Sequence, residues 1–185
     1  MIALSATSCA EQKADDFRWQ IDNFDDIKVL RYKVHGFEQL SLEQKELIYY
    51  LNQAAISGRD IMFDQNFKYN LAIRRTLEAI YQNYQGDKEC ADWKAFEKYL
   101  KKVWFANGIH HHYSNDKFKP EFSQEYFENV LVAQCAATIP NEGFSSQAEM
   151  MNIIVPAIFD PELYASKLVQ ADGVDVLKAS SMNYY

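Results

Sequence analysis

The sequence lacks the features by which many enzyme and membrane classes are identified at once. It contains no HExxH, GxSxG, P-loop or GxGxxG motif. No apolar stretch approaches the roughly 20 residues that a membrane-spanning helix needs. There is no basic run, and a net charge of −7 repels phosphate backbones. Nucleic acid is therefore excluded as an expected partner.

Cysteine is also scarce, because the chain has only Cys9, Cys90 and Cys135. An odd number at wide spacing makes a poor disulfide framework and a poor zinc site. Cys90 and Cys135 are therefore interpreted as ordinary thiols. A disulfide between them would need an oxidising compartment and close Cα atoms.

The first nine residues are small and apolar and end on Cys9, as in the tail of a bacterial lipoprotein signal. The basic segment of such a signal is missing and the apolar run is short. Residues 1–15 are interpreted as a signal-like remnant that is expected to be disordered, with a frayed terminus as the alternative. Lipidation of Cys9 is the one expected link to a membrane. If a full signal precedes the chain, we expect a bacterial periplasmic or lipid-anchored envelope protein, and otherwise a cytoplasmic one.

What the chain does have is enough large side chains for a core, with 48% hydrophobic and 15% aromatic residues. Residues 17–35 alternate with period two, which predicts two strands joined by a turn at 23–26. Helical spacing and capping residues predict helices over 41–62, 67–84, 90–105, from Ser123, from Ser146 to Pro156, and from Asp160. The predicted fold class is mainly α (α+β), a helical lobe with a short N-terminal β segment.

The densest group of titratable side chains is His110-His111-His112, followed by Tyr113 in a polar loop. Three imidazoles can bind a transition metal, but adjacent residues rarely reach one ion with good geometry. A solvated loop and a substrate contact in a cleft both stay open as interpretations.

Two stretches resemble the N-terminal region of the dipeptidyl peptidase III family, especially its bacterial branch. The first runs from Leu47 to Ala55 and is followed by Gly58 and Arg59, similar to a Y-x-L-x-x-A-A-x-x-G helix of the family. The second is Trp104-Phe105-Ala106-Asn107-Gly108, continuing through Tyr113 to Asp116-Lys117-Phe118-Lys119-Pro120. It resembles an N-x-G turn, an aromatic residue, a D-x-K-F segment and a proline. The match spans most of residues 28–160.

The resemblance implies a two-lobed zinc metallopeptidase with a wide cleft, which releases dipeptides from peptide N-termini. The family's HExxGH motif lies in the other lobe and is not found among these 185 residues. Zinc is therefore expected in the full-length parent, with its ligands outside this chain. Residues 16–185 are expected to be the N-terminal helical lobe, truncated at its C-terminus and inactive alone. Its expected partners are the missing C-terminal lobe and a peptide substrate.

Aligned on the second stretch, Tyr113 falls where the family places an aromatic residue on the cleft wall. Gly108 would permit the tight turn that brings the loop there, because glycine tolerates positive φ. The resemblance thus implies substrate-binding but no catalytic or metal-binding residues, and the candidates are Tyr113, His112, His111, His110, Asn115, Asn107 and Gly108. The alternatives are a stand-alone helical peptide-binding module of the bacterial envelope and a metal-sensing domain that uses the three histidines.

Overall fold

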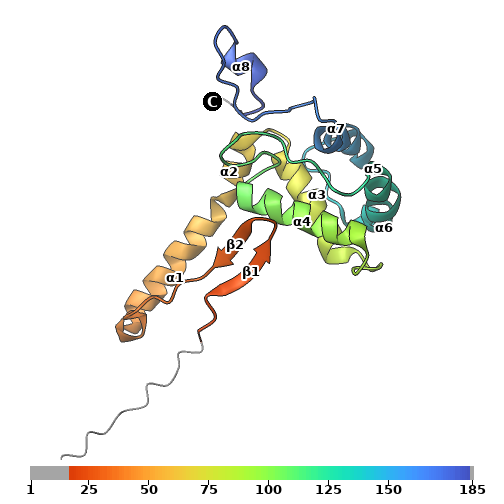
Figure 1. Ribbon diagram of the computed structural model, residues 1–185. Helices are drawn as coiled ribbons and strands as arrows, with labels where there is room; N and C mark the ends of the chain where they lie inside the picture. The colour runs from red at the N-terminus through yellow and green to blue at the C-terminus, as the bar shows by residue number, and fades with distance from the viewer. Residues whose placement is uncertain (1–16, 184–185) are drawn as a thin grey trace, which may run out of the picture. The chain divides into compact units, whose positions relative to one another are not determined.

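The computed structural model describes residues 17–183 (Figure 1). The chain divides into two compact units, Met1–Ser41 and Leu42–Tyr185, and each is described by itself. The expectations for residues 1–15, Cys9 included, lie outside the described residues.

The first unit is built around an antiparallel hairpin. Strand β1 (Gln20–Phe24) pairs with β2 (Ile27–Leu30), and the register places Phe24 opposite Ile27 with an irregularity between Gln20 and Asp22. The strands are confirmed, but the connection is shorter than the predicted 23–26, since only Asp25 and Asp26 separate them. Asp25 takes up the tight turn with φ 51°, a conformation that Asp adopts more readily than most residues. A 3-10 turn, Phe37–Gln39, follows.

The second unit is helical, which confirms the predicted mainly α class with a short N-terminal β segment. Its α-helices are α1 (Leu42–Ser57), α2 (Arg59–Asn66), α3 (Asn70–Asn83), α4 (Ala91–Ala106), α5 (Gln124–Tyr126), α6 (Ala133–Cys135), α7 (Gln147–Phe159) and α8 (Val176–Ala179). A π-helical segment, Phe127–Val132, joins α5 to α6, and a 3-10 turn, Ala136–Thr138, follows α6.

The core of this unit lies where α3, α4, the π-helical segment and α7 meet. The predicted apolar faces of α3 and α4 are buried except for Tyr81, which is half-buried, and Trp104, which is exposed. Aromatic rings fill much of the centre, and Trp93 stacks on Tyr84 with ring centroids 4.8 Å apart. The N-terminal caps of α5 and α7 form as predicted, from Ser123 and Ser146. The Cys90 thiol caps α4, which was not predicted.

Helix α1 does not take part in this core. None of its residues is buried, and it extends from α2 away from the α3–α4 pair (Figure 1). Leu47 and Leu51 are 59% and 60% exposed. An apolar face at helical spacing normally packs against a partner. The apolar pattern of α1 therefore predicts burial, whereas the structure leaves this helix exposed.

Two predicted helix boundaries were wrong. The first helix does not run through Gly58, because the chain closes a turn there (Gly58 N to Ala55 O, 3.2 Å) and α2 starts afresh; glycine is a weak helix former. Pro156 does not end α7, which continues to Phe159, because a proline in the last turn removes only one N–H.

The helix predicted from Asp160 does not form. The Asp160 carboxylate accepts hydrogen bonds from the N–H groups of Glu162 and Leu163, at 2.9 and 3.4 Å, as a cap would. The chain then turns through Tyr164, whose φ is 54°, and continues in an extended ladder. Asp160 thus caps the chain as predicted, but no helix follows, because residues 165–167 form backbone hydrogen bonds with residues 115–117 instead. The last helix is instead α8, capped by Asp175.

Candidate functional site

The loop that follows α4 begins with two special backbone positions. Asn107 ends the helix in the left-handed region, with φ 55°. Gly108 has φ 146°, and a Cβ added there would lie 2.1 Å from the Asn70 side-chain nitrogen. Glycine is therefore required at 108, both for its conformation and for the close approach of Asn70.

Asn70, at the start of α3, is the residue that holds this loop. It is fully buried; its amide nitrogen donates to the carbonyls of Phe63 (3.0 Å) and Asn107 (3.5 Å), and its amide oxygen accepts from Ile109 N (3.1 Å). Buried polar groups are stable only when they are hydrogen-bonded in this way. Sequence reasoning missed Asn70, although a single amide between apolar residues was a usable signal.

Beyond the turn, four extended segments lie side by side. His111 N donates to Asp116 O (2.8 Å), and Lys117 N donates to Ala165 O (2.9 Å). The ladder is completed by Ser181 N, which donates to Ser166 O (3.2 Å). Residues 109–111, 115–118, 165–167 and 181–182 thus form a small irregular sheet that ties the loop to the C-terminal part of the chain. None of this pairing was predicted.

His110 points into the protein and is 2% exposed. Its Nε2 lies 2.8 Å from the carbonyl oxygen of Tyr164, so Nε2 carries the proton and donates. Its Nδ1 is buried and has no hydrogen-bond partner in the described part of the chain. Burial lowers the pKa of His110 from 6.5 to about 4, against the opposing effect of the Tyr164 carbonyl. This histidine is therefore neutral at pH 7 and acts as a packing and positioning group.

The next three residues form the outer edge of the loop. The His111 Nδ1 accepts from the N–H groups of Tyr113 and Ser114, at 3.2 and 3.1 Å, which fixes the bend. The rings of His112 and Tyr113 are 4.2 Å apart, and Phe105 packs on His112 at 5.0 Å. Tyr113 is 83% exposed. These rings present a small aromatic surface to solvent.

Lys117, from the family-like Asp116-Lys117-Phe118 segment, has a structural role. Its ammonium donates to the carbonyl oxygens of Ala157 (3.1 Å), Asp160 and Leu163, where α7 ends. A cation at this end complements the helix dipole and satisfies carbonyls that the helix leaves open. Burial lowers the pKa of Lys117.

The seven predicted site residues are thus brought onto one loop, but with different exposures. Tyr113 alone is well exposed, His111, His112, Asn107 and Asn115 are half-buried, and His110 and Gly108 are buried. Asn115 contributes its backbone, since its carbonyl oxygen accepts from Lys167 N (2.8 Å) and the Ser166 hydroxyl (3.3 Å). Substrate contact by this loop stays a prediction, which the geometry concentrates on Tyr113, His111 and His112.

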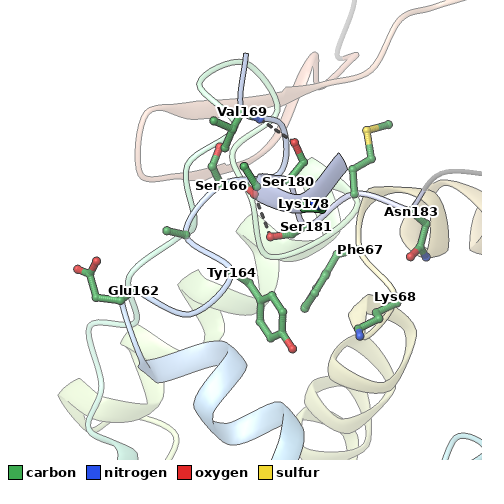
Figure 2. Close-up of a pocket in the computed structure, with 13 residues that line it drawn as sticks. Phe67, Lys68, Glu162, Tyr164, Ser166, Val169, Lys178, Ser180, Ser181 and Asn183 are labelled. Atoms are coloured by element: carbon green, nitrogen blue, oxygen red, sulfur yellow. Dashed lines mark hydrogen bonds between the residues drawn. The ribbon is translucent and has the colours of Figure 1, made fainter. Parts of the chain in front are cut away.

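A pocket of about 430 Å³ lies next to this ladder, between the start of α3 and the C-terminal segment (Figure 2). Phe67, Lys68 and Tyr164 form one side, and Ser180 and Ser181 the other. The two serine hydroxyls are already engaged, with Val169 N (2.9 Å) and the Ser166 carbonyl (2.9 Å). These two hydroxyls therefore hold the C-terminal segment together, and none of the seven predicted residues lines the pocket.

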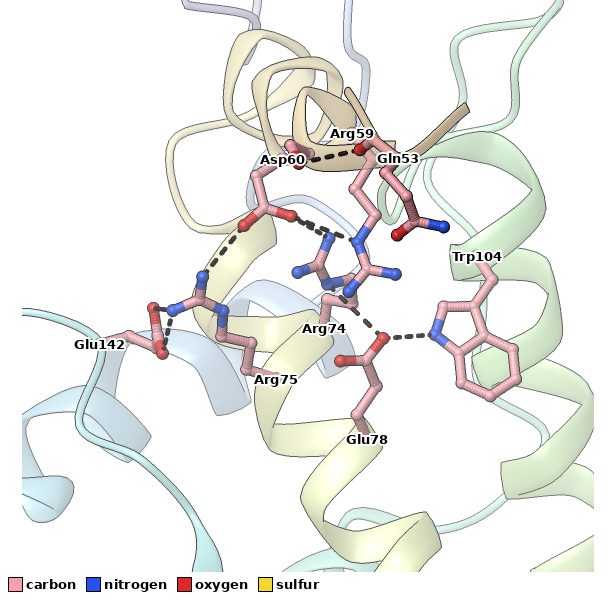
Figure 3. A network of polar contacts seen from close by, with 9 residues as sticks. Gln53, Arg59, Asp60, Arg74, Arg75, Glu78, Trp104 and Glu142 are labelled. Carbon is pink, nitrogen blue, oxygen red and sulfur yellow. Dashed lines mark hydrogen bonds and ion pairs between the residues drawn. The ribbon is translucent and has the colours of Figure 1, made fainter. Parts of the chain in front are cut away.

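A second region, missed by the sequence reasoning, is a network of charged side chains on α2 and α3 (Figure 3). Asp60 accepts from Arg74 at 2.9 Å and from Arg75 at 3.0 Å, and these hydrogen bonds lower its pKa, with Arg74 the larger cause. Arg75 also binds both oxygens of Glu142, at 2.6 and 2.5 Å, which raises its own pKa. The adjacent arginines inside a helical apolar pattern were the signal that sequence reasoning passed over.

No family model matches this chain, and no curated protein matches it either. Within residues 17–183, no three His, Cys, Asp or Glu side chains are grouped so that they could hold a metal ion. No helix in that range is long and apolar enough to cross a membrane.

Proposed function

We propose that the chain is the N-terminal, cleft-forming part of a zinc-dependent dipeptidyl peptidase whose zinc motif lies outside these residues. The parent would release dipeptides from peptide N-termini, with peptide as substrate and a C-terminal lobe as the partner of this one. If a lipoprotein signal precedes Cys9, the enzyme works at the bacterial envelope, and otherwise in the cytoplasm.

The observation that carries this proposal is the exposure of α1. The first family-like stretch, Leu47 to Ala55, lies in this helix, and no residue of the helix is buried. Apolar patches larger than a few hundred Å² are rare on monomeric proteins and mark interaction surfaces. An apolar helix that ends up in water agrees with a lobe whose partner covers it in the parent.

A substitution pair tests this idea directly. Leu47→Gln with Leu51→Gln should leave the melting temperature of the 185-residue chain unchanged, because both side chains are already exposed. In the parent the same pair should cost roughly 3 kcal/mol or more, since each buried leucine is worth about 1.5–3 kcal/mol. Equal small effects in both proteins would show that α1 is not an interface.

The second family-like stretch supports the proposal through its shape. Asn70, Gly108 and Lys117 fix the loop, and Tyr113 projects from it into solvent. A rigid loop that carries one exposed aromatic ring can offer apolar area and a hydroxyl to a peptide. In the complete enzyme, Tyr113→Ala should lower kcat/KM roughly tenfold, since one good contact is worth ~1–2 kcal/mol. Zinc content and melting temperature should not change.

Tyr32, which is similarly exposed but lies in the first unit, provides the matched control, Tyr32→Ala. The decisive observation is the reading frame after Tyr185. An in-frame HExxGH supports the peptidase, whereas a stop codon there would refute it and favour the stand-alone peptide-binding module.

A further inference from the structure

A pocket of about 380 Å³ lies between α2, α3 and the end of α4. Phe63, Arg59, Arg74, Glu78, Trp104 and Asn107 line it. Figure 3 shows the guanidinium groups of Arg59 and Arg74 near the Glu78 carboxylate and the indole of Trp104. The pocket therefore combines both signs of charge with an aromatic wall.

The interior side of the pocket is a buried cation. The Arg74 side chain is 4% exposed, its guanidinium carbon lies 4.6 Å from the centre of the Phe63 ring, and it pairs with Asp60 at 2.9 Å. Its Nε has no hydrogen-bond partner in the described part of the chain, and the Glu78 carboxylate lies 3.6 Å from it. Arg74 is thus held in place by Asp60 and Phe63 and supplies fixed positive charge.

Two polar groups at the mouth of the pocket have capacity left. Arg59 is 63% exposed, and within the described residues its guanidinium meets only Asp60, at 3.7 Å. Glu78 uses one oxygen, Oε1, to accept from the Trp104 indole N–H at 2.9 Å and to face Arg74. Its other oxygen, Oε2, makes no hydrogen bond or ion pair within residues 17–183. One donor fork and one carboxylate oxygen are therefore available to a ligand.

The charged side chains around the pocket indicate which class of ligand it can bind. The network around the pocket has three arginines and three carboxylates, Asp60, Glu78 and Glu142, so it is neutral but strongly polarised. A simple anion would meet Glu78, and a simple cation would meet Arg59 and Arg74. A zwitterion satisfies both, because a carboxylate suits a guanidinium fork and an ammonium suits a carboxylate oxygen.

We propose that this pocket binds a zwitterionic amino acid or dipeptide with an aromatic side chain. Its carboxylate pairs with Arg59, its ammonium pairs with Glu78 Oε2, and its side chain lies on Trp104, which is 37% exposed. The pocket shares Asn107 with the Tyr113 loop but is not lined by Tyr113 or the three histidines, and the inference does not depend on the peptidase proposal.

The test is calorimetric titration of the 185-residue chain with the dipeptide Ala-Phe and two blocked derivatives. N-acetyl-Ala-Phe lacks the ammonium, and the amide of Ala-Phe lacks the carboxylate. We expect Ala-Phe to bind and each blocked form to bind at least tenfold more weakly. No binding of Ala-Phe at 10 mM, or equal binding of either blocked form, overturns the proposal.

Variants locate the site. Arg59→Gln and Glu78→Gln should each weaken Ala-Phe binding at least tenfold, while Lys94→Gln, an exposed charge change on the neighbouring α4, should stay within twofold of wild type. Because Glu78→Gln could disturb folding, the indole N–H resonance of Trp104 in the unmodified chain gives a second readout. It should shift on adding Ala-Phe, and binding without that shift would place the ligand elsewhere and refute the assignment.

Discussion

The buried imidazole of His110 should make the stability of this protein depend on pH in a specific window. Burial lowers its pKa to about 4, whereas in the unfolded chain the pKa is near 6.5. Below pH 6.5 the His110 imidazole is therefore protonated in the unfolded state but stays neutral in the folded state, which lowers the free energy of unfolding. The stabilisation is complete above pH 6.5 and is lost as the pH falls from 6.5 toward 4.

The magnitude follows from the two pKa values. At about 1.4 kcal/mol per pKa unit, the full effect is about 3 kcal/mol. Between pH 7.5 and pH 5 it amounts to about 2 kcal/mol, because the folded state is still almost unprotonated at pH 5. Carboxylates titrate in the lower part of this range as well, so the effect must be read as a difference between two proteins.

The comparison protein is His110→Gln, which can still donate to the Tyr164 carbonyl but does not titrate. Urea unfolding at pH 7.5, 6 and 5 should show the wild type losing about 2 kcal/mol more than the variant. His35→Gln, at an exposed position of the first unit, is the control and should follow the wild type. A difference below about 0.5 kcal/mol between wild type and His110→Gln would refute the reasoning.

Three further substitutions probe the loop and the C-terminal segment. Gly108→Ala should destabilise the chain by about 2–4 kcal/mol in urea unfolding, because the new Cβ meets Asn70 at 2.1 Å and φ is 146°; a loss under 1 kcal/mol would contradict the close approach. Lys117→Met should cost about 1–3 kcal/mol by leaving the carbonyls of Ala157, Asp160 and Leu163 unpaired, whereas exposed Lys119→Met should be neutral. Asn183→Ala removes the side-chain bond to the Asp64 carbonyl and should speed proteolysis within residues 165–183 without a large change in global stability; unchanged cleavage would argue against this anchor.

Local signals in the sequence predicted the elements but not their connections. Period-two alternation found both strands, and apolar spacing found the buried faces of α3 and α4, because these patterns depend on neighbours within a few residues. The same spacing in α1 predicted a helix correctly but could not tell that its face stays exposed. Periodicity shows that a face is apolar, not whether its partner is in the same chain.

The parts of the candidate sites that depend on distant residues could not be predicted. Asn70 contacts residues about 40 positions away, and Lys117 caps a helix end 40 or more positions later. His110 looked like a loop histidine from its polar neighbours, yet the Tyr164 segment covers it. Asp160 forms the predicted cap, but the chain after it pairs with the backbone of residues 115–117 and does not form a helix. In each case long-range contact outweighed the local preference.

The Tyr113 loop and the pocket between α2, α3 and α4 are held by the same hydrogen bonds, so a change in one is expected to affect the other. Asn107 lines this pocket and also begins the Tyr113 loop. Its carbonyl oxygen is held by the side chains of Asn66 (3.0 Å) and Asn70 (3.5 Å), and Asn70 also binds the carbonyl of Phe63, another pocket residue. A packed hydrogen-bonded interior transmits displacement instead of absorbing it. We therefore expect Gly108→Ala, which pushes Asn70 aside, to displace Phe63 and Asn107 as well and to weaken the proposed Ala-Phe binding in calorimetric titration. Unchanged binding in a folded Gly108→Ala variant would show that the two sites are independent.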